Sequence, residues 1–159
     1  MGRLLERKHV AMVMPPAADR FDTSQVSAPV NLANYSNAEF IVAIGAGATG
    51  TATLTVEACD DNSGTNPVAI PFELAVQSPG ANTNDTWGAY ADQTSAGYTT
   101  VAGDYKLLSI RVRARQLPSG KQWCRVKATE VVNSPVAAAI IAILGCPRYS
   151  QVPNRKALA

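Results

Sequence analysis

A glycine-rich segment, Gly45-Ala46-Gly47-Ala48-Thr49-Gly50, has the G-x-G-x-x-G spacing of dinucleotide-binding loops. In such sites a strand precedes the glycines, and the helix that follows holds the pyrophosphate at its N-terminus. Residues 39–44 predict the strand, but residues 51–58 alternate threonine or glutamate with alanine, leucine and valine. This period of two predicts a half-buried strand and not a helix. We therefore predict that the glycines form the turn of a β-hairpin, and we expect no cofactor.

Few other residues of the chain could carry out catalysis. The one histidine, His9, begins a predicted strand, which leaves no second imidazole for a catalytic triad elsewhere or a histidine-rich metal site. Glu57, Glu73 and Glu130 could supply paired carboxylates, but each has an outward-facing or packing explanation in a strand. The run Asp60-Asp61-Asn62 lacks the later glutamate of an EF-hand calcium loop and is typical of a turn. We predict that the protein is not an enzyme and holds no metal.

The three cysteines show no C-x-x-C spacing and predict neither a zinc site nor a disulfide framework. Cys124 and Cys146 lie in apolar runs, where a free thiol behaves as a small hydrophobe. Cys59 ends a strand at a turn, so we expect it to be the most exposed of the three.

Basic residues provide the clearest positive signal. Two alternating runs, 108–115 and 123–131, flank the turn Leu117-Pro118-Ser119-Gly120 and predict a second hairpin with one strongly basic face. That face would carry Arg111, Arg113, Arg115, Trp123, Arg125 and Lys127. Like charges on adjoining strands repel, so we expect an acidic counterpart: Glu130 and Asp104 nearby, a partner protein, or nucleic acid. A solvated face with local acidic partners is one interpretation; the other is a subunit contact, since arginine and tryptophan are enriched at interfaces.

The elements that must position these residues are nearly all strands. Turn signals recur about every ten residues, and no segment predicts an amphipathic helix. The alanines of the apolar run Val136 to Gly145 would permit a helix, but Pro135 and Gly145 limit it to strand length, which favours a central strand buried on both faces. We predict an all-β fold, an antiparallel β-sandwich or jelly roll of eight to nine strands. Residues 1–8 and 147–159 would be extended N- and C-terminal arms around a domain of residues 9–146.

Composition limits the partners. The net charge of +2 is too small to predict nucleic-acid binding by the whole domain, although Arg3, Arg7, Lys8 and Arg148 make both termini basic. Charged residues make up only 16% of the chain against roughly 25% in an average domain. Either neighbouring subunits cover part of the surface, or threonine, serine and asparagine hydrate it. The longest apolar run has nine residues, too few to span a membrane, and the N-terminus does not resemble a signal peptide.

Several strand patterns together resemble small structural proteins of tailed bacteriophages, of the decoration or minor capsid type. The resemblance spans residues 30–149 and is carried by Val30-Asn31-Leu32, Ala38-Glu39-Phe40-Ile41-Val42, Gly45-Ala46-Gly47, residues 53–60, Ile70-Pro71-Phe72 and Gly145-Cys146-Pro147-Arg148-Tyr149. It implies a β-sandwich that binds a capsid or another virion protein, often as a homo-oligomer, after assembly in the host cytoplasm. It implies no catalytic residue.

The contact residues expected on this interpretation are the basic face, the two termini and Tyr149. An alternative is a carbohydrate-binding β-sandwich for host-surface attachment, with Trp87, Tyr90 and Tyr98 as a stacking platform. The position in the particle, the partner and the oligomeric state do not follow from the sequence.

Overall fold

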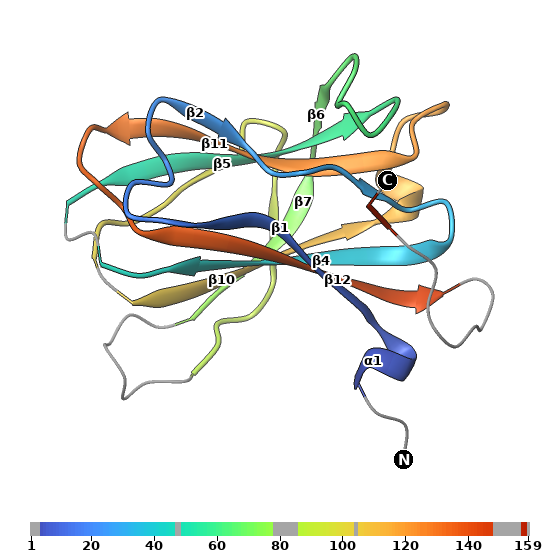
Figure 1. Cartoon of the computed structure of the whole chain (residues 1–159), viewed down its shortest axis with the longest axis horizontal. Coiled ribbons are helices and arrows are strands. Elements are labelled where there is room, and N and C mark those ends of the chain that lie inside the picture. The colour runs from blue at the N-terminus through green and yellow to red at the C-terminus, as the bar shows by residue number, and fades with distance from the viewer. Residues whose placement is uncertain (1–3, 47–48, 78–85, 104, 148–156, 159) are drawn as a thin grey trace.

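The computed structural model describes residues 4–46, 49–77, 86–103, 105–147 and 157–158 of the chain (Figure 1). Its described part is nearly all β-structure in two packed sheets, which confirms the predicted antiparallel β-sandwich. Twelve strands are present there, more than the eight to nine expected, because several polar stretches contain short strands of two or three residues.

Each sheet contains six strands. Sheet A has the order β1 (His9–Ala17), β12 (Ala138–Pro147), β4 (Tyr35–Ile44), β10 (Lys106–Arg113), β7 (Phe72–Val76) and β8 (Ala91–Gln93). Sheet B has the order β2 (Ser24–Val26), β11 (Trp123–Val132), β5 (Thr51–Cys59) and β6 (Val68–Ile70), and β3 (Val30–Asn31) and β9 (Tyr98–Thr99) join it beside β11 and β5. All the pairings within both sheets are antiparallel.

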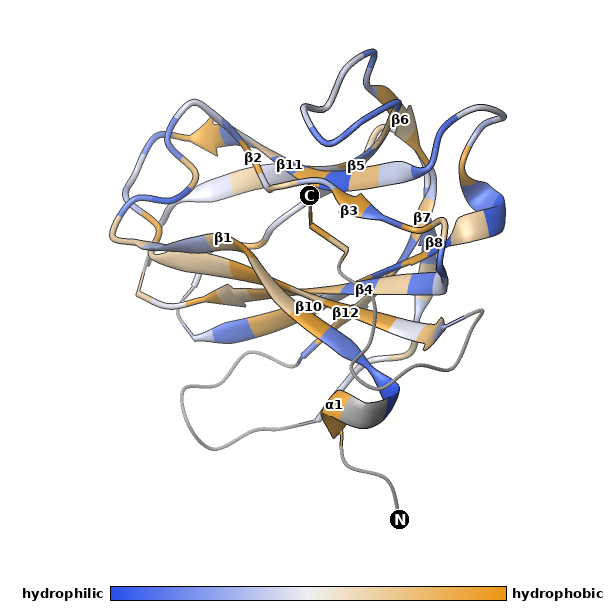
Figure 2. Cartoon of the chain, turned by 45° about the vertical axis from the view of Figure 1, so that its right-hand side comes forward, coloured by the Kyte–Doolittle hydropathy of each residue, from blue (hydrophilic) through white to orange (hydrophobic). Residues whose placement is uncertain are grey.

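The alternation of apolar and polar residues builds the core between the sheets. Along β4, the side chains of Ala38, Phe40, Val42 and Ile44 are buried while the intervening ones are half-buried. The predicted strand β5 likewise buries residues 52, 54, 56 and 58. In Figure 2 the hydrophobic colour recurs along the strands of both layers, whereas the loop beside β6 is mostly hydrophilic. Burial of these alternating positions fixes the register, since a slip of one residue would turn each apolar set outward.

The two predicted hairpins are wrong. β4 lies in sheet A and β5 in sheet B, so the glycine-rich segment connects the two layers and the two strands do not pair with each other. Gly45 N–H donates to the Ala137 carbonyl at 2.7 Å, which ties the start of the connection to the strand neighbouring β4. A side chain at Gly50 would collide with the Ser134 carbonyl and with Val136, so the close approach of two backbones requires glycine there. As expected, a strand follows the glycines and not the helix of a dinucleotide site.

The second correction concerns β10 and β11. They are consecutive long strands, but β10 pairs with β4 and β7, and β11 pairs with β2, β3 and β5. A short 3-10 helix, η1 (Ala114–Gln116), begins the connection that crosses from sheet A to sheet B. Similarly, the segment interrupted by Pro71 is two strands in different sheets: Ile70 ends β6 and Phe72 begins β7.

β12 is an inner strand of sheet A, between β1 and β4, as predicted. Its inner face is fully packed, and its outer face is apolar yet half-buried, so the expectation of complete burial on both faces is met on one face only. The outer face of β12 therefore presents hydrophobic side chains at the surface of the sandwich.

Neither terminal segment is simply an extended arm. Residues Leu4–Arg7 form a single turn of α-helix, α1, which contacts β1 and β12. At the other end Ala157 is buried, and its carbonyl accepts a 2.9 Å hydrogen bond from Asn31 N–H. The end of the predicted C-terminal tail thus packs against the sandwich beside β3. None of the helices in the described ranges has the length and apolar character needed to cross a membrane.

Candidate interaction surface

The structure divides the predicted basic face between opposite sides of the molecule. Arg111 and Arg113 lie on β10, on the outer face of sheet A, whereas Arg125 and Lys127 lie on β11, on the outer face of sheet B. The prediction of a single basic face is therefore wrong, because it required the two strands to pair as a hairpin.

The basic side chains of sheet B are neutralised within the sheet. Arg125 binds the Glu57 carboxylate through Nε and Nη2, both at 2.8 Å, and Lys127 Nζ lies 3.8 Å from the same carboxylate. Arg125 and Glu57 side chains are only 13% and 11% exposed. Trp123, predicted to be an exposed contact residue, is half-buried. With their charges paired and partly covered, these residues offer little to a partner.

Three arginines of the predicted set do come together, around an open hollow of about 530 Å³ beside η1. Arg111, Arg113 and Arg115 line it with Ser36, whose hydroxyl donates to the Cys146 carbonyl. Glu73 on β7 is their acidic partner: Arg113 Nη2 lies 2.8 Å from its carboxylate and Arg111 Nε 3.4 Å. One carboxylate thus serves two guanidinium groups, and the exposed Arg115 has no ion pair among the described residues. Glu130, one of the counterparts expected from the sequence, does not pair with these arginines.

Glu130 instead accepts a hydrogen bond from Thr23 N–H, and Asp104 lies outside the described residues. Glu57 and Glu73 lie on opposite sheets, so the three glutamates considered for paired catalysis do not converge.

Beside the arginine hollow, the outer face of sheet A carries apolar residues on three neighbouring strands. The register aligns Met12 on β1 with Ile141 on β12 and Ile41 on β4, and the next row aligns Val10 with Ile143 and ends at Glu39 on β4. Met12 is 56% exposed, and the others are half-buried. We call the five apolar residues of this set the apolar rows. An exposed hydrophobic area on an otherwise regular sheet is typical of a surface that contacts another protein.

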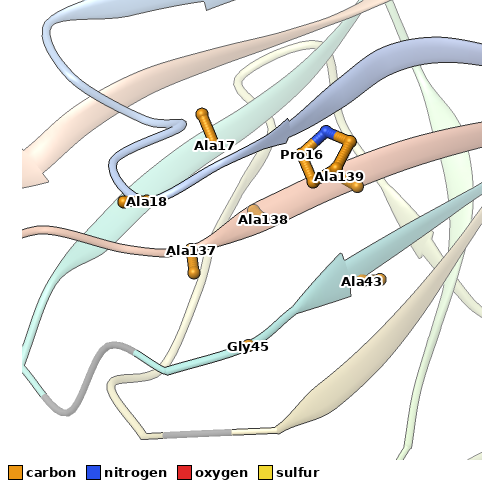
Figure 3. Close-up of a pocket in the computed structure, with 8 residues that line it drawn as sticks. All are labelled: Pro16, Ala17, Ala18, Ala43, Gly45, Ala137, Ala138 and Ala139. Carbon is orange, nitrogen blue, oxygen red and sulfur yellow. The ribbon is translucent and has the colours of Figure 1, made fainter.

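A shallow hollow of about 480 Å³ extends this apolar surface toward the end of sheet A. Figure 3 shows that proline, alanine and glycine line it, among them Pro16, Ala43 and Ala139. None of these side chains can donate or accept a hydrogen bond. The side chains of this hollow can therefore add apolar contact area but no hydrogen bond.

A third, smaller pocket of about 260 Å³ lies on the same outer face, over β4, β7 and β10. Trp87 and Tyr90 line it and are 41% and 42% exposed. Tyr90 Oη donates to Glu39 Oε1 at 2.8 Å, and Ser109 Oγ donates to the same oxygen at 2.6 Å. Burial raises the pKa of the Tyr90 phenol above its usual value, so the phenol remains a donor at neutral pH. Tyr98, the third aromatic residue of the predicted platform, packs against the core from sheet B and lies apart from this pocket.

The terminal contact residues are only partly placed. Arg7 is exposed at the end of α1, and Lys8 follows it half-buried. Arg3, Arg148 and Tyr149 lie outside the described residues. His9 lies with its ring centroid 6.1 Å from that of Tyr35, a packing contact.

The expectation for two of the cysteines was reversed. Cys59 and Cys124 are buried, and Cys146 is exposed. Cys59 ends β5 where the following turn meets Lys121, whose ammonium group donates to Asp60 Oδ1 at 2.6 Å. Burial raises the pKa of both the Cys59 and the Cys124 thiols, so neither is activated as a nucleophile.

The acidic turn after β5 satisfies its own carboxylates, as predicted for a turn. Asp61 Oδ1 accepts from Ser63 N–H and Thr65 N–H, and Oδ2 accepts from the Thr65 hydroxyl at 2.7 Å. The hydrogen bonds from Thr65 lower the pKa of Asp61, and those from Lys121 and Asn66 lower the pKa of Asp60. Within the described residues, no three histidine, cysteine or acidic side chains are grouped so as to hold a metal ion.

Comparison with known proteins gives a likeness at the level of structure. No protein-family model matches the chain, and no curated protein matches it either. Among solved structures the chain is similar to the crystal structure of the SPBc2 prophage-derived protein YomS, with a TM-score of 0.48 and 11% sequence identity over 87% of this chain and 93% of that chain. The function therefore has to be inferred from the residues of this chain.

Proposed function

We propose that this protein is a non-enzymatic structural component of a phage particle, which binds a capsid or neighbouring virion protein through the outer face of sheet A. The observation that carries the binding role is the hollow of Arg111, Arg113 and Arg115 beside the apolar rows on one face of the sandwich. The assignment to a phage particle, assembled in the host cytoplasm, rests on the strand patterns of residues 30–149.

The chemistry of this face suits a protein partner with acidic side chains. Arg111 and Arg113 share one carboxylate and Arg115 has no ion pair among the described residues, so a carboxylate from a partner would gain charge-assisted hydrogen bonds in the hollow. Burial of the apolar rows would contribute the non-directional part of the binding free energy. Nucleic acid is a poorer candidate, because the net charge of the chain is only +2.

The apolar rows also support the proposal that the protein is a homo-oligomer. Met12, Ile141 and Ile41 form a flat row with no charged member, which a second copy could cover with its own row. The exposed Leu4 and Leu5 of α1 and the basic Arg7 add a further contact at one end. This arrangement accounts for the low charged fraction of the chain as a surface partly covered in the assembly.

The role in a particle is tested with purified phage particles made by the phage that encodes the chain. Quantitative mass spectrometry should find the protein at a fixed copy number per particle, and the purified protein should bind particles from which its gene was deleted. Absence of the protein from the particles would overturn the assignment.

The binding face is tested by a matched pair of substitutions. Arg115→Ser should weaken binding to gene-deleted particles about tenfold, because a charge-assisted hydrogen bond contributes roughly 1.5–3 kcal/mol. Lys127→Ser removes the same charge from the outer face of sheet B and should leave the affinity unchanged. Equal effects of the two substitutions would show that only net charge matters and would contradict the proposed face.

A further inference from the structure

The pocket beneath Trp87 and Tyr90 is built from residues that are distant in the sequence. Glu39 comes from β4, Ser109 from β10 and Ala75 from β7, and Trp87 and Tyr90 come from the segment before β8. Backbone contacts hold this segment over the sheet: Gly88 N–H donates to the Val76 carbonyl at 3.0 Å, and Trp87 forms an isolated bridge with Gln77. Ser109 and Ala75 belong to the outer face, yet both are only 2% exposed.

One end of the pocket is polar and is organised before any ligand arrives. Tyr90 Oη, Ser109 Oγ and Glu39 Oε1 form a closed triangle with separations of 2.8, 2.6 and 2.8 Å. Both hydroxyls donate to the same carboxylate oxygen. Glu39 Oε2 accepts no hydrogen bond from the described residues and can accept one from a ligand.

The rest of the pocket lining includes aromatic and apolar side chains. Trp87 and Ile41 are among them, and the indole is 41% exposed. A volume of about 260 Å³ is below the roughly 300–1,000 Å³ of sites for drug-sized molecules, so the pocket suits a single ring. The ligand therefore needs an apolar face for the indole and hydroxyl donors for the carboxylate.

Nearby charges select against an ionic ligand. The Arg111 guanidinium carbon lies 5.6 Å from the centroid of the Tyr90 ring and already occupies the cation–π position there. A cationic ligand would meet this guanidinium, and an anionic ligand would meet the Glu39 carboxylate. A neutral ligand meets neither repulsion.

We propose that this pocket binds a neutral sugar ring, with its C–H face stacked on Trp87 and a hydroxyl donating to Glu39. Stacking on an aromatic ring satisfies the apolar face of a pyranose, and the carboxylate satisfies its hydroxyl groups. The site differs from the platform predicted from the sequence: Tyr98 is absent from it, and Glu39 and Ser109 complete it. It is a second function of the protein, on the same outer face of sheet A as the arginine hollow, and Arg111 contacts both sites.

The site is tested on the full-length protein with a glycan array and with titrations of glucose, galactose, mannose and N-acetylglucosamine. Glucosamine and N-acetylneuraminic acid serve as cationic and anionic probes. We expect one or more neutral sugars to bind, with affinities at least tenfold above those of the charged probes. Absence of binding to every neutral glycan, or stronger binding of a charged probe, would overturn the proposal.

Substitutions place the ligand in the pocket. Trp87→Ala should weaken binding about tenfold, because an aromatic stacking contact contributes up to about 1.5 kcal/mol. Trp87→Phe keeps a stacking face and should restore most of the affinity, and Glu39→Gln should lower it. Tyr105→Ala removes a comparably exposed aromatic ring, 51% exposed, that does not line the pocket, and should change nothing. Binding unaffected by Trp87→Ala would contradict the site even if a sugar binds elsewhere.

Discussion

At the scale of single residues, alanine substitutions at two glycines with positive φ distinguish the cost of backbone strain from the cost of a steric clash. Gly64 has φ +76° and faces the Arg125 guanidinium, whereas Gly120 has φ +85° and open space where a methyl group would lie, with nothing within 4 Å. Gly120→Ala should cost about 1 kcal/mol, the strain of a left-handed conformation. Gly64→Ala should cost at least about 1 kcal/mol more, because the methyl group displaces Arg125 from Glu57. Urea unfolding of both variants checks this, and equal midpoints would contradict the role of Arg125.

The cysteines give a second prediction at this scale. A thiol reagent such as DTNB at pH 8 should react rapidly with one thiol of the native protein, because Cys146 is exposed and the others are buried. Their raised pKa values further lower the reactive thiolate fraction at Cys59 and Cys124. In denaturant three thiols should react. Cys146→Ser should abolish the rapid reaction; a rapid phase that persists would show that one of the buried cysteines is accessible.

At the scale of the elements, each sheet carries one glutamate that pairs with two basic side chains on its outer face. Glu57 and its partner Arg125 are 11% and 13% exposed, whereas Glu73 is 18% exposed with partners at 32% and 36%. Removal of one partner of a buried pair costs more than loss of an exposed pair. Glu57→Gln should therefore destabilise the protein by about 2 kcal/mol, and Glu73→Gln by less than about 1 kcal/mol. Thermal and urea unfolding should reproduce this order, and the reverse order would contradict it.

The elements also show what the sequence could and could not predict. The alternation of residues 51–58 and 108–113 correctly predicted strands and their buried faces, because burial on one face is a local pattern. The sheet that a strand joins, by contrast, depends on residues that are distant in the sequence. A turn such as residues 45–50 reverses the chain equally well toward the same sheet or the opposite one, and only the pairing of β4 with β10 and β12 decides between them. The predicted basic face was wrong for the same reason.

The pocket of Trp87 and Tyr90 was predicted only in part. The aromatic residues lie close together in the sequence and were found, whereas Glu39 and Ser109 reach them through pairings across sheet A. A signal was present: Glu39 and Ser109 are polar residues within apolar strands. The register between the two strands does not follow from the sequence, however, so their convergence could not be derived.

For the whole molecule, the apolar rows predict association in solution. Sedimentation velocity at micromolar concentration should show a species larger than the 16.7 kDa monomer. Met12→Lys places a charge in the rows and should shift the population toward the monomer, since an unpaired charge in a buried contact is costly. Val68→Lys is the control, because Val68 is similarly exposed, 45%, but lies on β6 of sheet B. A monomeric wild-type protein would contradict the proposed homo-oligomer.

The topology of the whole molecule also predicts slow folding. Most long strands pair with partners distant in the chain, such as β4 with β12 and β5 with β11, and neither predicted hairpin exists to form early. Folding rates fall as contacts become less local, so refolding should take milliseconds to seconds. Stopped-flow fluorescence of the two tryptophans checks this, and refolding within microseconds would contradict it.

The repeated passage of the chain between the layers has a mechanical consequence. Between Ile70 in sheet B and Phe72 in sheet A only Pro71 intervenes, and the connections after β4 and β10 cross in the same way. A force applied to one outer face therefore reaches the other through covalent backbone as well as through the packed core. The two layers cannot be pulled apart without extracting strands from their sheets, so the sandwich should resist separation of its layers under load.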